Sequence, residues 1–287
     1  MAYKRRAPSW WARAFLRNFL AWLAIAFALF PAAFVLGTSF NPVNSLSATR
    51  IIPRHPSLSN YVRLFSETSF AAWFLNTVKI AGISAILSVF FCALGAYAFS
   101  RFRFRGRRAG LLMLLLVQTF PQSLAMVAIY LILLKIGHYL PWAGLGTHPG
   151  LILVYLGGSI GFNTWFMKGY FDTIPRSLEE SALVDGATHF QAFWRIILPL
   201  ARPILAVVFV IQFITFYSEY LIASFVLKGD KSYTLALGLY YLINEHYRDR
   251  WGIFAAGAVI GAGLVLLIFY ALQSQIVSGL TGGSVKE

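Results

Sequence analysis

A polar segment of about thirty residues, 172–202, holds the side chains with the clearest functional potential, because it separates two long apolar runs. Ser177 and Glu180 have the spacing of a capping box, in which each side chain accepts a hydrogen bond from the other residue's backbone N–H at the start of a helix. Gly186 follows, and it lacks the Cβ that would oppose the left-handed turn at a helix end. The pattern predicts a short helix that ends at a glycine hinge.

A second short helix is predicted after the hinge. Thr188 and Gln191 have the spacing of another capping box, and Pro199 is expected to stop the helix. The apolar side of this helix would be formed by Phe190, Phe193, Trp194 and Ile197. Such a helix–glycine–helix, projecting from a membrane on the cytoplasmic side, is suited to docking a soluble partner. The expected docking residues are Glu180, Ser181, Ala182, Asp185, Gly186, Ile196, Leu198 and Pro199. For Asp185, helix capping and docking both stay open.

Catalytic and metal chemistry are not indicated elsewhere in the chain. Cys92 is the only cysteine and lies in an apolar run, so the chain has no disulfide framework or thiolate cluster. The five histidines show no zinc-ligand spacing. There is no Gly-Lys dipeptide and therefore no Walker A loop. The sequence predicts a chain that is not an enzyme and binds no cofactor; any ATP-Mg would be bound by a partner subunit.

Glu219 is a carboxylate within an apolar run, where it is costly unless it is paired or hydrated. Two roles stay open for it: a place on a translocation path or gate, and a structural hydrogen bond to a neighbouring helix. Gln212 precedes it by two helical turns and would line the same face. The sequence makes both residues candidates for a translocation path.

The composition is that of a membrane protein. Of 287 residues, 59% are hydrophobic and 12% are charged, about half the charged fraction of soluble domains. A helix needs about twenty apolar residues to cross a bilayer. Six runs qualify, roughly Asn18–Phe40, Ala72–Phe99, Leu111–Lys135, Leu151–Tyr170, Ile204–Leu227 and Ile253–Val277. We therefore expect an all-α protein with six transmembrane helices, and with 172–202 between the fourth and the fifth.

The distribution of Lys and Arg sets the expected orientation. Basic residues are dense in 4–17 and in 101–108, and further ones lie in 172–202, whereas the alternate loops hold fewer over a greater length. Both termini and 172–202 are therefore predicted to be cytoplasmic. The net charge of +14 fits contact with anionic membrane lipid. No nucleic-acid partner is expected, because the basic clusters are dispersed between the spans.

The outward loop from Lys228 to Trp251 is predicted to be long. It mixes charged residues with tyrosines, a composition suited to gripping another protein's surface. The candidate contact residues are Tyr240, Tyr241 and Asn244. Cross-linking during turnover would show whether this loop is more than a connector.

The docking segment also resembles that of ABC importer permeases. The family pattern Glu-Ala-Ala, three residues, Gly, nine residues, Ile-x-Leu-Pro is matched at Glu180, Ala182, Gly186, Ile196, Leu198 and Pro199. Ser181 stands where the family usually has Ala, and serine is small enough for the same packing. In that family the segment is the coupling helix, which lies in a groove of an ATPase subunit.

Other stretches are similar to sugar-importer permeases. Residues 96–102 with Gly106 look like the end of their second span, and 279–286 look like the tail of their smaller subunit. Residues 137–148 and 155–158 are similar to the smaller permease subunit of maltose/maltodextrin importers. The resemblance covers nearly the whole chain.

The resemblance implies a type I ABC importer permease fold in an inner membrane complex. The partners would be a second, different permease, two ATPase subunits and an extracytoplasmic sugar-binding protein. The implied organisation is an N-terminal arm (1–17), a first transmembrane helix (18–40), a permease domain (71–277) with the coupling segment, and a cytoplasmic tail (278–287). A permease for another sugar is the alternative. A secondary transporter is disfavoured, because no inverted repeat or ion relay is visible.

Overall fold

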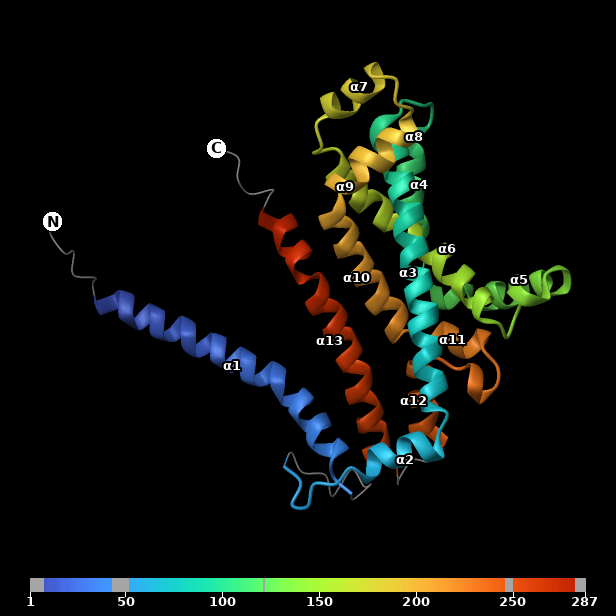
Figure 1. The fold of residues 1–287 in the computed structure, drawn as a ribbon. Coiled ribbons are helices and arrows are strands. Elements are labelled where there is room, and N and C mark those ends of the chain that lie inside the picture. Colours follow the sequence, from blue (N-terminus) through green and yellow to red (C-terminus); the bar gives the residue numbers. More distant parts are fainter. Residues whose placement is uncertain (1–7, 43–51, 121, 246–249, 282–287) are drawn as a thin grey trace. The chain divides into compact units, whose positions relative to one another are not determined.

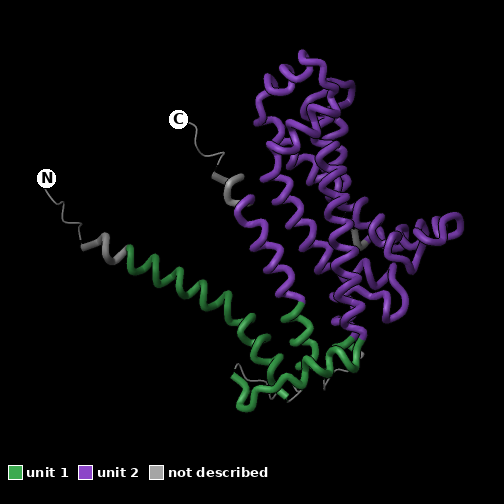
Figure 2. Tube along the Cα trace, viewed as in Figure 1, with its two compact units in different colours: residues 1–68, 242–260 green, residues 69–241, 261–287 purple. Residues whose placement is uncertain are grey.

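The chain is almost entirely helical in the computed structural model, which describes residues 8–42, 52–120, 122–245 and 250–281 (Figure 1). No strand occurs in these ranges, so the all-α class is confirmed. Two compact units are present (Figure 2): one comprises 1–68 and 242–260, and the other 69–241 and 261–287. The second unit carries the residues discussed most below.

Four helices of the described residues are long and apolar enough to cross a membrane by themselves. They are α1 (Pro8–Ser39), α3 (Phe70–Arg101), α6 (His148–Phe171) and α13 (Trp251–Thr281). These helices correspond to the first, second, fourth and sixth predicted runs. The helix α13 continues to Thr281, so it includes the start of the predicted tail; residues beyond 281 lie outside the described part of the chain.

The third predicted run is interrupted. It contains α4 (Arg107–Gln118), the 3₁₀ turn η2 (Gln122–Ala125) and α5 (Met126–Tyr139). Proline at 121 has no N–H to donate to a helix, and proline disfavours helical geometry in the residue before it. Neither α4 nor α5 is long enough to span a bilayer alone.

The fifth predicted run is also broken. The helix α10 (Arg202–Ser218) ends before Glu219, and a short helix α11 (Leu221–Val226) follows. At its other end α10 meets the preceding helical stretch at an angle of 77°. If that bent pair counts as one span, the described residues contain five candidates. The six-span count stays a prediction.

The core of the second unit is formed mainly by α3 together with α6 and α10. Small residues permit close approach: a Cβ added at Gly95 of α3 would lie 3.0 Å from the Thr164 methyl of α6. One buried cluster lies where the end of α3 meets 172–202, and it contains Cys92, Ala93, Ala96, Tyr97, Met167, Phe171, Ile174, Phe193, Ile197, Ala201, Ile204 and Val208. The docking segment is thus packed onto the membrane helices.

In the first unit, the short helix α2 (Ser59–Glu67) holds the end of α1. The Asn60 amide donates to the carbonyls of Ser39 (3.0 Å) and Asn41 (2.8 Å). The Tyr61 hydroxyl lies 2.9 Å from that of Ser39. These contacts fix where α1 ends.

Candidate functional site

The segment 172–202 folds as a short helical hairpin, which we define as residues 176–200. It consists of α7 (Arg176–Val184), a turn, α8 (His189–Ala192), the π-helix η4 (Phe193–Ile197) and α9 (Leu198–Leu200). The two short helices predicted from the sequence are present. The hairpin lies at the end of the second unit where α3 finishes (Figure 1).

Gly186 forms the hinge that its position predicts. Its φ of 86° is left-handed, and its N–H donates to the Leu183 carbonyl at 3.1 Å. The Ala187 N–H donates to the Ala182 carbonyl at 2.9 Å. These two bonds make a Schellman motif, which satisfies carbonyls left free at the end of α7. A Cβ at Gly186 would meet nothing within 4 Å, so the torsion alone requires glycine.

One predicted capping box is confirmed and the other is wrong. Thr188 and Gln191 bond reciprocally, the Gln191 N–H donating to the Thr188 hydroxyl at 3.2 Å. Ser177 does not cap α7, because Pro175 is the residue that precedes the helix and Ser177 lies inside the first turn. From there its carbonyl accepts from the Ser181 hydroxyl at 2.8 Å, and Glu180 is exposed.

Pro199 does not stop the second helix, contrary to expectation. The helical stretch continues to Leu200 and breaks at Ala201. The preceding residues form a π-helix, in which the Leu198 N–H donates to the Phe193 carbonyl. The wider π-turn ends one hydrogen-bonding pattern before the proline, and Pro199 then lies in the first turn of α9. At that position its lack of an N–H does not break the helix.

The four aromatic and aliphatic residues expected on one side of the second helix lie on two sides. Phe193 and Ile197 are buried in the core, whereas Phe190 and Trp194 are 65% and 53% exposed. The exposed pair is stacked, with ring centroids 6.3 Å apart. Val184 at the end of α7 is also exposed. The hairpin therefore has one buried apolar face and one free apolar face.

The other candidate docking residues also differ in their exposure to solvent. Ser181 and Asp185 are exposed, whereas Ala182, Ile196 and Leu198 are half-buried. Asp185 occupies the C-terminal end of α7 beside Gly186. The structure brings these residues together on one hairpin, and their role in docking stays a prediction.

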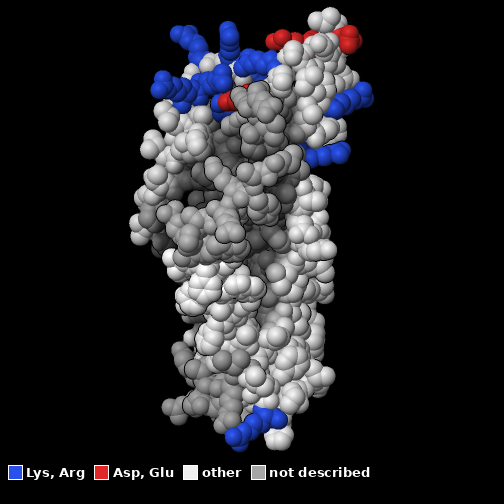
Figure 3. Space-filling model, turned by 90° about the vertical axis from the view of Figure 1, so that its left-hand side faces the viewer, with Lys and Arg blue, Asp and Glu red and all other residues white. Residues whose placement is uncertain are grey.

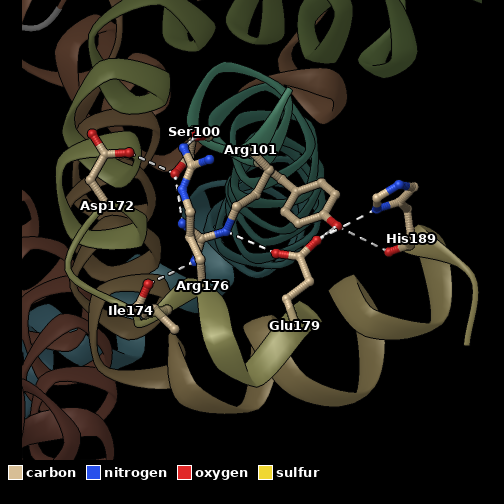
Figure 4. A network of polar contacts seen from close by, with 8 residues as sticks. Ser100, Arg101, Asp172, Ile174, Arg176, Glu179 and His189 are labelled. Carbon is tan, nitrogen blue, oxygen red and sulfur yellow. Dashed lines mark hydrogen bonds and ion pairs between the residues drawn. The ribbon is translucent and has the colours of Figure 1, made fainter. Parts of the chain in front are cut away.

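A buried ion pair anchors the hairpin to α3 (Figure 4). Arg101 Nε lies 2.9 Å from Glu179 Oε2, and both side chains are almost completely buried. The Nε–H does not point along this line, so the contact is an ion pair without an aligned hydrogen bond. Arg101 Nη2 donates to the Ile174 carbonyl at 3.0 Å. The Tyr97 hydroxyl donates to Glu179 and is 3.2 Å from the His189 carbonyl of α8.

A second set of contacts lies beside this pair (Figure 4). The Ser100 hydroxyl donates to Asp172 Oδ1 at 2.6 Å, and Arg176 Nη2 donates to the Ser100 carbonyl at 3.0 Å. Lys168 forms an ion pair with Asp172. Partial burial raises the pKa of Asp172, but hydrogen bonds from Lys168 and Ser100 outweigh it, so the net pKa lies below its ordinary value.

Sequence reasoning missed Glu179, Arg101 and Tyr97. The available signal was the position of Arg101, a cation at the very end of an apolar span. Glu179 was overlooked because its neighbour Glu180 carries the recognisable motif. No group of His, Cys, Asp and Glu that could hold a metal occurs among the described residues.

A cavity of about 1550 Å³ lies among α4, α5, α6, α10 and α11. Glu219 and Gln212 both line it, as their shared helix face predicts. Gln212 Nε2 donates to the Ser88 hydroxyl at 3.1 Å, and that hydroxyl is 2.8 Å from Ser159. The walls are mainly apolar, with these polar groups gathered on the α6 and α10 sides.

Glu219 makes the structural hydrogen bond that was one of its two expected roles. Its Oε2 accepts from the Tyr155 hydroxyl of α6 at 2.7 Å. Its Oε1 accepts from the Ile222 N–H at 2.7 Å, and Oε2 also accepts from the Ala223 N–H at 3.1 Å. The carboxylate thus satisfies the first turn of α11 at the break in the fifth run. Its role on a translocation path stays a prediction.

The segment 228–251, expected as a long connection after the fifth run, contains helix within its described residues. It contains the 3₁₀ turn η5 (Asp230–Ser232) and α12 (Leu235–Glu245). Trp73 Nε1 donates to the Asp230 carbonyl at 2.8 Å, which fastens the segment to α3. Apolar residues at helical spacing cause this: Leu235, Leu239 and Leu242 are buried.

The three candidate contact residues of this segment differ in exposure. Tyr240 is exposed and stacks on Tyr220 with ring centroids 4.8 Å apart. Tyr241 and Asn244 are half-buried, and Tyr241 stacks on Tyr233. Residues 246–249 lie outside the described part of the chain.

The helical fold and the candidate spans are those of a helical membrane protein, and the glycine-hinged hairpin lies at one end of its span bundle. The chain belongs to the family described as binding-protein-dependent transport system inner membrane component, whose model matches residues 89–280. It is therefore an integral inner membrane protein.

Three named transport permeases are similar to this chain over nearly its whole length. The chain is 41% identical to the maltose/maltodextrin transport system permease protein of Vibrio vulnificus (strain YJ016), over 96% of both chains. The Escherichia coli (strain K12) protein of the same name is also 41% identical over 96% of both chains. The galactooligosaccharides transport system permease protein of Bacillus subtilis (strain 168) is 39% identical, over 96% of this chain and 97% of that protein.

A solved structure confirms the fold. A chain in the crystal structure of a bacterial ABC transporter involved in the import of the acidic polysaccharide alginate is 22% identical and has a TM-score of 0.81. The match covers 94% of this chain and 98% of that one. This chain therefore has the fold of that transporter chain.

Proposed function

We propose that this chain is one of two different permease subunits of an ATP-driven sugar importer. It would form half of the translocation pathway for maltose/maltodextrin-like oligosaccharides. Relatives named for maltose/maltodextrin and for galactooligosaccharides are almost equally similar, at 41% and 39% identity. The proposed substrate class is therefore an oligosaccharide, with maltodextrins as the first to be tested.

The proposed partners are two ATPase subunits on the cytoplasmic side and a sugar-binding protein on the other. Both chain termini would be cytoplasmic, as the distribution of basic residues predicts. A related crystal structure contains an alginate ABC transporter with a pentasaccharide-bound periplasmic protein. Tyr240, Tyr241 and Asn244 are the proposed contact residues for such a protein, and Glu219 and Gln212 are proposed for the pathway.

The observation that carries the proposal is the two-sided hairpin. Its buried face is joined to α3 by the Arg101–Glu179 pair and by the packing of Phe193 and Ile197. Its other face presents exposed apolar groups, including Phe190 and Trp194. A moving ATPase that held the exposed face would pull α3 and α10 with it. The permease then needs no covalent chemistry, only two arrangements of its helices.

The direct test replaces Gly186 with valine. The left-handed torsion of Gly186 costs an L-residue about 1–2 kcal/mol, so the hinge should distort. We expect the assembled complex to hydrolyse ATP without matching sugar uptake. Gly169→Val is the matched control, because a Cβ at this helical glycine meets nothing within 4 Å and needs no left-handed torsion.

The measurement is the ratio of sugar uptake to ATP hydrolysis in the reconstituted complex. Full uptake by Gly186→Val in a properly assembled complex would contradict the coupling role. The sugar is a separate question. Uptake of a panel of radiolabelled oligosaccharides by the wild-type complex would identify it, and uptake of none of them would contradict the proposed substrate class.

A further inference from the structure

The loop between α3 and α4 forms a basic surface that the proposed function does not use. Lys and Arg side chains gather at the end of the second unit where the hairpin lies (Figure 3). Within this surface a hollow of about 710 Å³ is lined by Phe104, Gly106, Arg107, Arg108, Ala109, Leu111 and Lys168. We call this hollow the basic pocket. It combines three cations with apolar groups.

The arginines of the loop form no ion pair within the described residues, although Arg107 is close enough to Asp172 to help lower the pKa of that carboxyl. Arg103, Arg105, Arg107 and Arg108 have no carboxylate within ion-pair distance in that part of the chain. Lys168 is the exception, since it pairs with Asp172. An excess of positive charges at one place attracts a polyvalent or membrane-bound anion.

The position of the basic pocket is that of a membrane surface. The membrane-spanning helix α3 ends at Arg101, five residues before the turn at Gly106. Lys168 lies in the last turn of α6, the neighbouring span. The cations are thus held at the ends of two adjacent spans, where phospholipid headgroups lie.

An apolar strip continues from the pocket along α4. Arg108, Leu112 and Leu116 recur every four residues and so share one helix face. Leu112 and Leu116 are 52% and 67% exposed, and Leu116 also lines the 1550 Å³ cavity described above. Arg108 and Leu116 are about 12 Å apart along the axis, close to the roughly 15 Å depth of one hydrocarbon leaflet. An occupant of both regions needs an anionic head joined to an apolar chain.

We infer that the basic pocket binds the phosphodiester headgroup of an anionic phospholipid, whose acyl chain lies along α4. The charge and the apolar strip fit this occupant together. A soluble acidic peptide would use the charge and leave Leu112 and Leu116 exposed. The inference rests on the membrane position of the chain and not on the identity of its sugar.

The test compares two double variants that each remove two positive charges from the same loop. Arg107→Gln/Arg108→Gln changes the basic pocket, and Arg103→Gln/Arg105→Gln changes exposed residues outside it. The full-length chain is purified in the complex it forms, and bound phosphatidylglycerol is titrated against phosphatidylcholine by native mass spectrometry. A charge-assisted hydrogen bond to a phosphate oxygen contributes about tenfold or more to affinity, so the pocket variant, which loses two such donors, should bind at least roughly 100-fold more weakly. The control should lose less than threefold.

Every other outcome overturns the inference. Equal losses in the two variants would mean diffuse attraction without a site. No loss in either would mean that another element or a protein partner occupies the surface. Displacement of the lipid by excess inorganic phosphate would indicate a site for the free anion, because the acyl chain would then add nothing. Thermal unfolding without phosphatidylglycerol should be the same for both variants, which separates lipid binding from folding.

Discussion

Breaking the Arg101–Glu179 pair should release the hairpin from α3. Glu179→Gln keeps the shape and an acceptor for Tyr97, but it leaves the buried Arg101 guanidinium without its counter-charge. Removing one partner of a buried ion pair costs about 3–5 kcal/mol. Because Arg101 also donates to the Ile174 carbonyl, we expect a value near the lower limit, about 3 kcal/mol. That corresponds to a roughly 140-fold larger population with the hairpin detached.

Hydrogen exchange measures this population directly. Backbone amides of the hairpin should exchange faster in Glu179→Gln, whereas those in the middle of α3 should not change. The matched control is Glu180→Gln, the same chemical change one residue further on, at an exposed position. We expect less than about 0.5 kcal/mol from the control. In the assembled complex, Glu179→Gln should also lower the ratio of sugar uptake to ATP hydrolysis.

A double variant tests whether the charges themselves are responsible. Arg101→Met/Glu179→Leu removes both charges and keeps the volume apolar, so it should recover much of the lost protection. Equal exchange of the hairpin amides in Glu179→Gln and Glu180→Gln would refute the reasoning. So would a double variant that is as destabilised as the sum of the two single ones, since the pair would then carry no coupling energy.

Three further predictions concern other parts of the second unit. Gly238→Ala should lower the free energy of unfolding by about 1–3 kcal/mol, and with it the thermal midpoint, because a Cβ there overlaps the Trp73 indole. Gly157→Ala is the control, since a Cβ at Gly157 meets nothing within 4 Å. Equal midpoints for the two variants would contradict the close packing at Gly238. Tyr155→Phe removes a hydrogen bond to the Glu219 carboxylate and should cost about 1–3 kcal/mol in chemical denaturation. In a Glu219→Leu background, which offers no acceptor to the Tyr155 hydroxyl, the same substitution should cost much less, and an equal cost in both backgrounds would contradict coupling of the two groups. A cysteine at the exposed Tyr240 should cross-link to the sugar-binding protein during turnover. The wild-type chain, whose Cys92 is buried, measures the background level of cross-linking. Adducts with lipid alone would make α12 a structural element only.

The hairpin was predictable because its determinants are local. A glycine after a helical pattern and a Thr-x-x-Gln box act over a few residues, and both are found where the sequence places them. The anchor was not predictable in the same way. Arg101 and Glu179 are far apart in the chain, and only the packing of α3 against 172–202 brings them together.

Hydropathy predicted the location of the apolar runs but not their continuity. Averaged over about twenty residues, the fifth run looks like one span, because a single carboxylate changes the mean little. Glu219 in fact marks the break, since its oxygens bond the first N–H groups of α11. The segment 228–251 shows the reverse case: its tyrosines and charges indicate a connection, while the spacing of its leucines builds the helix α12 within it.

The exposed face of the hairpin supports a docking role on physical grounds alone. From Phe190 to Ile197 the chain has large apolar residues on opposite sides, and a helix that is apolar all round is normally buried all round. Among the described residues, the chain buries the side of Phe193 and Ile197 and leaves Phe190 and Trp194 exposed. The stacked Phe190 and Trp194 lie on the uncovered side, in a segment otherwise polar enough to lie outside the bilayer. Contact with another protein would bury Phe190 and Trp194, so that both apolar sides of the helix would then be covered.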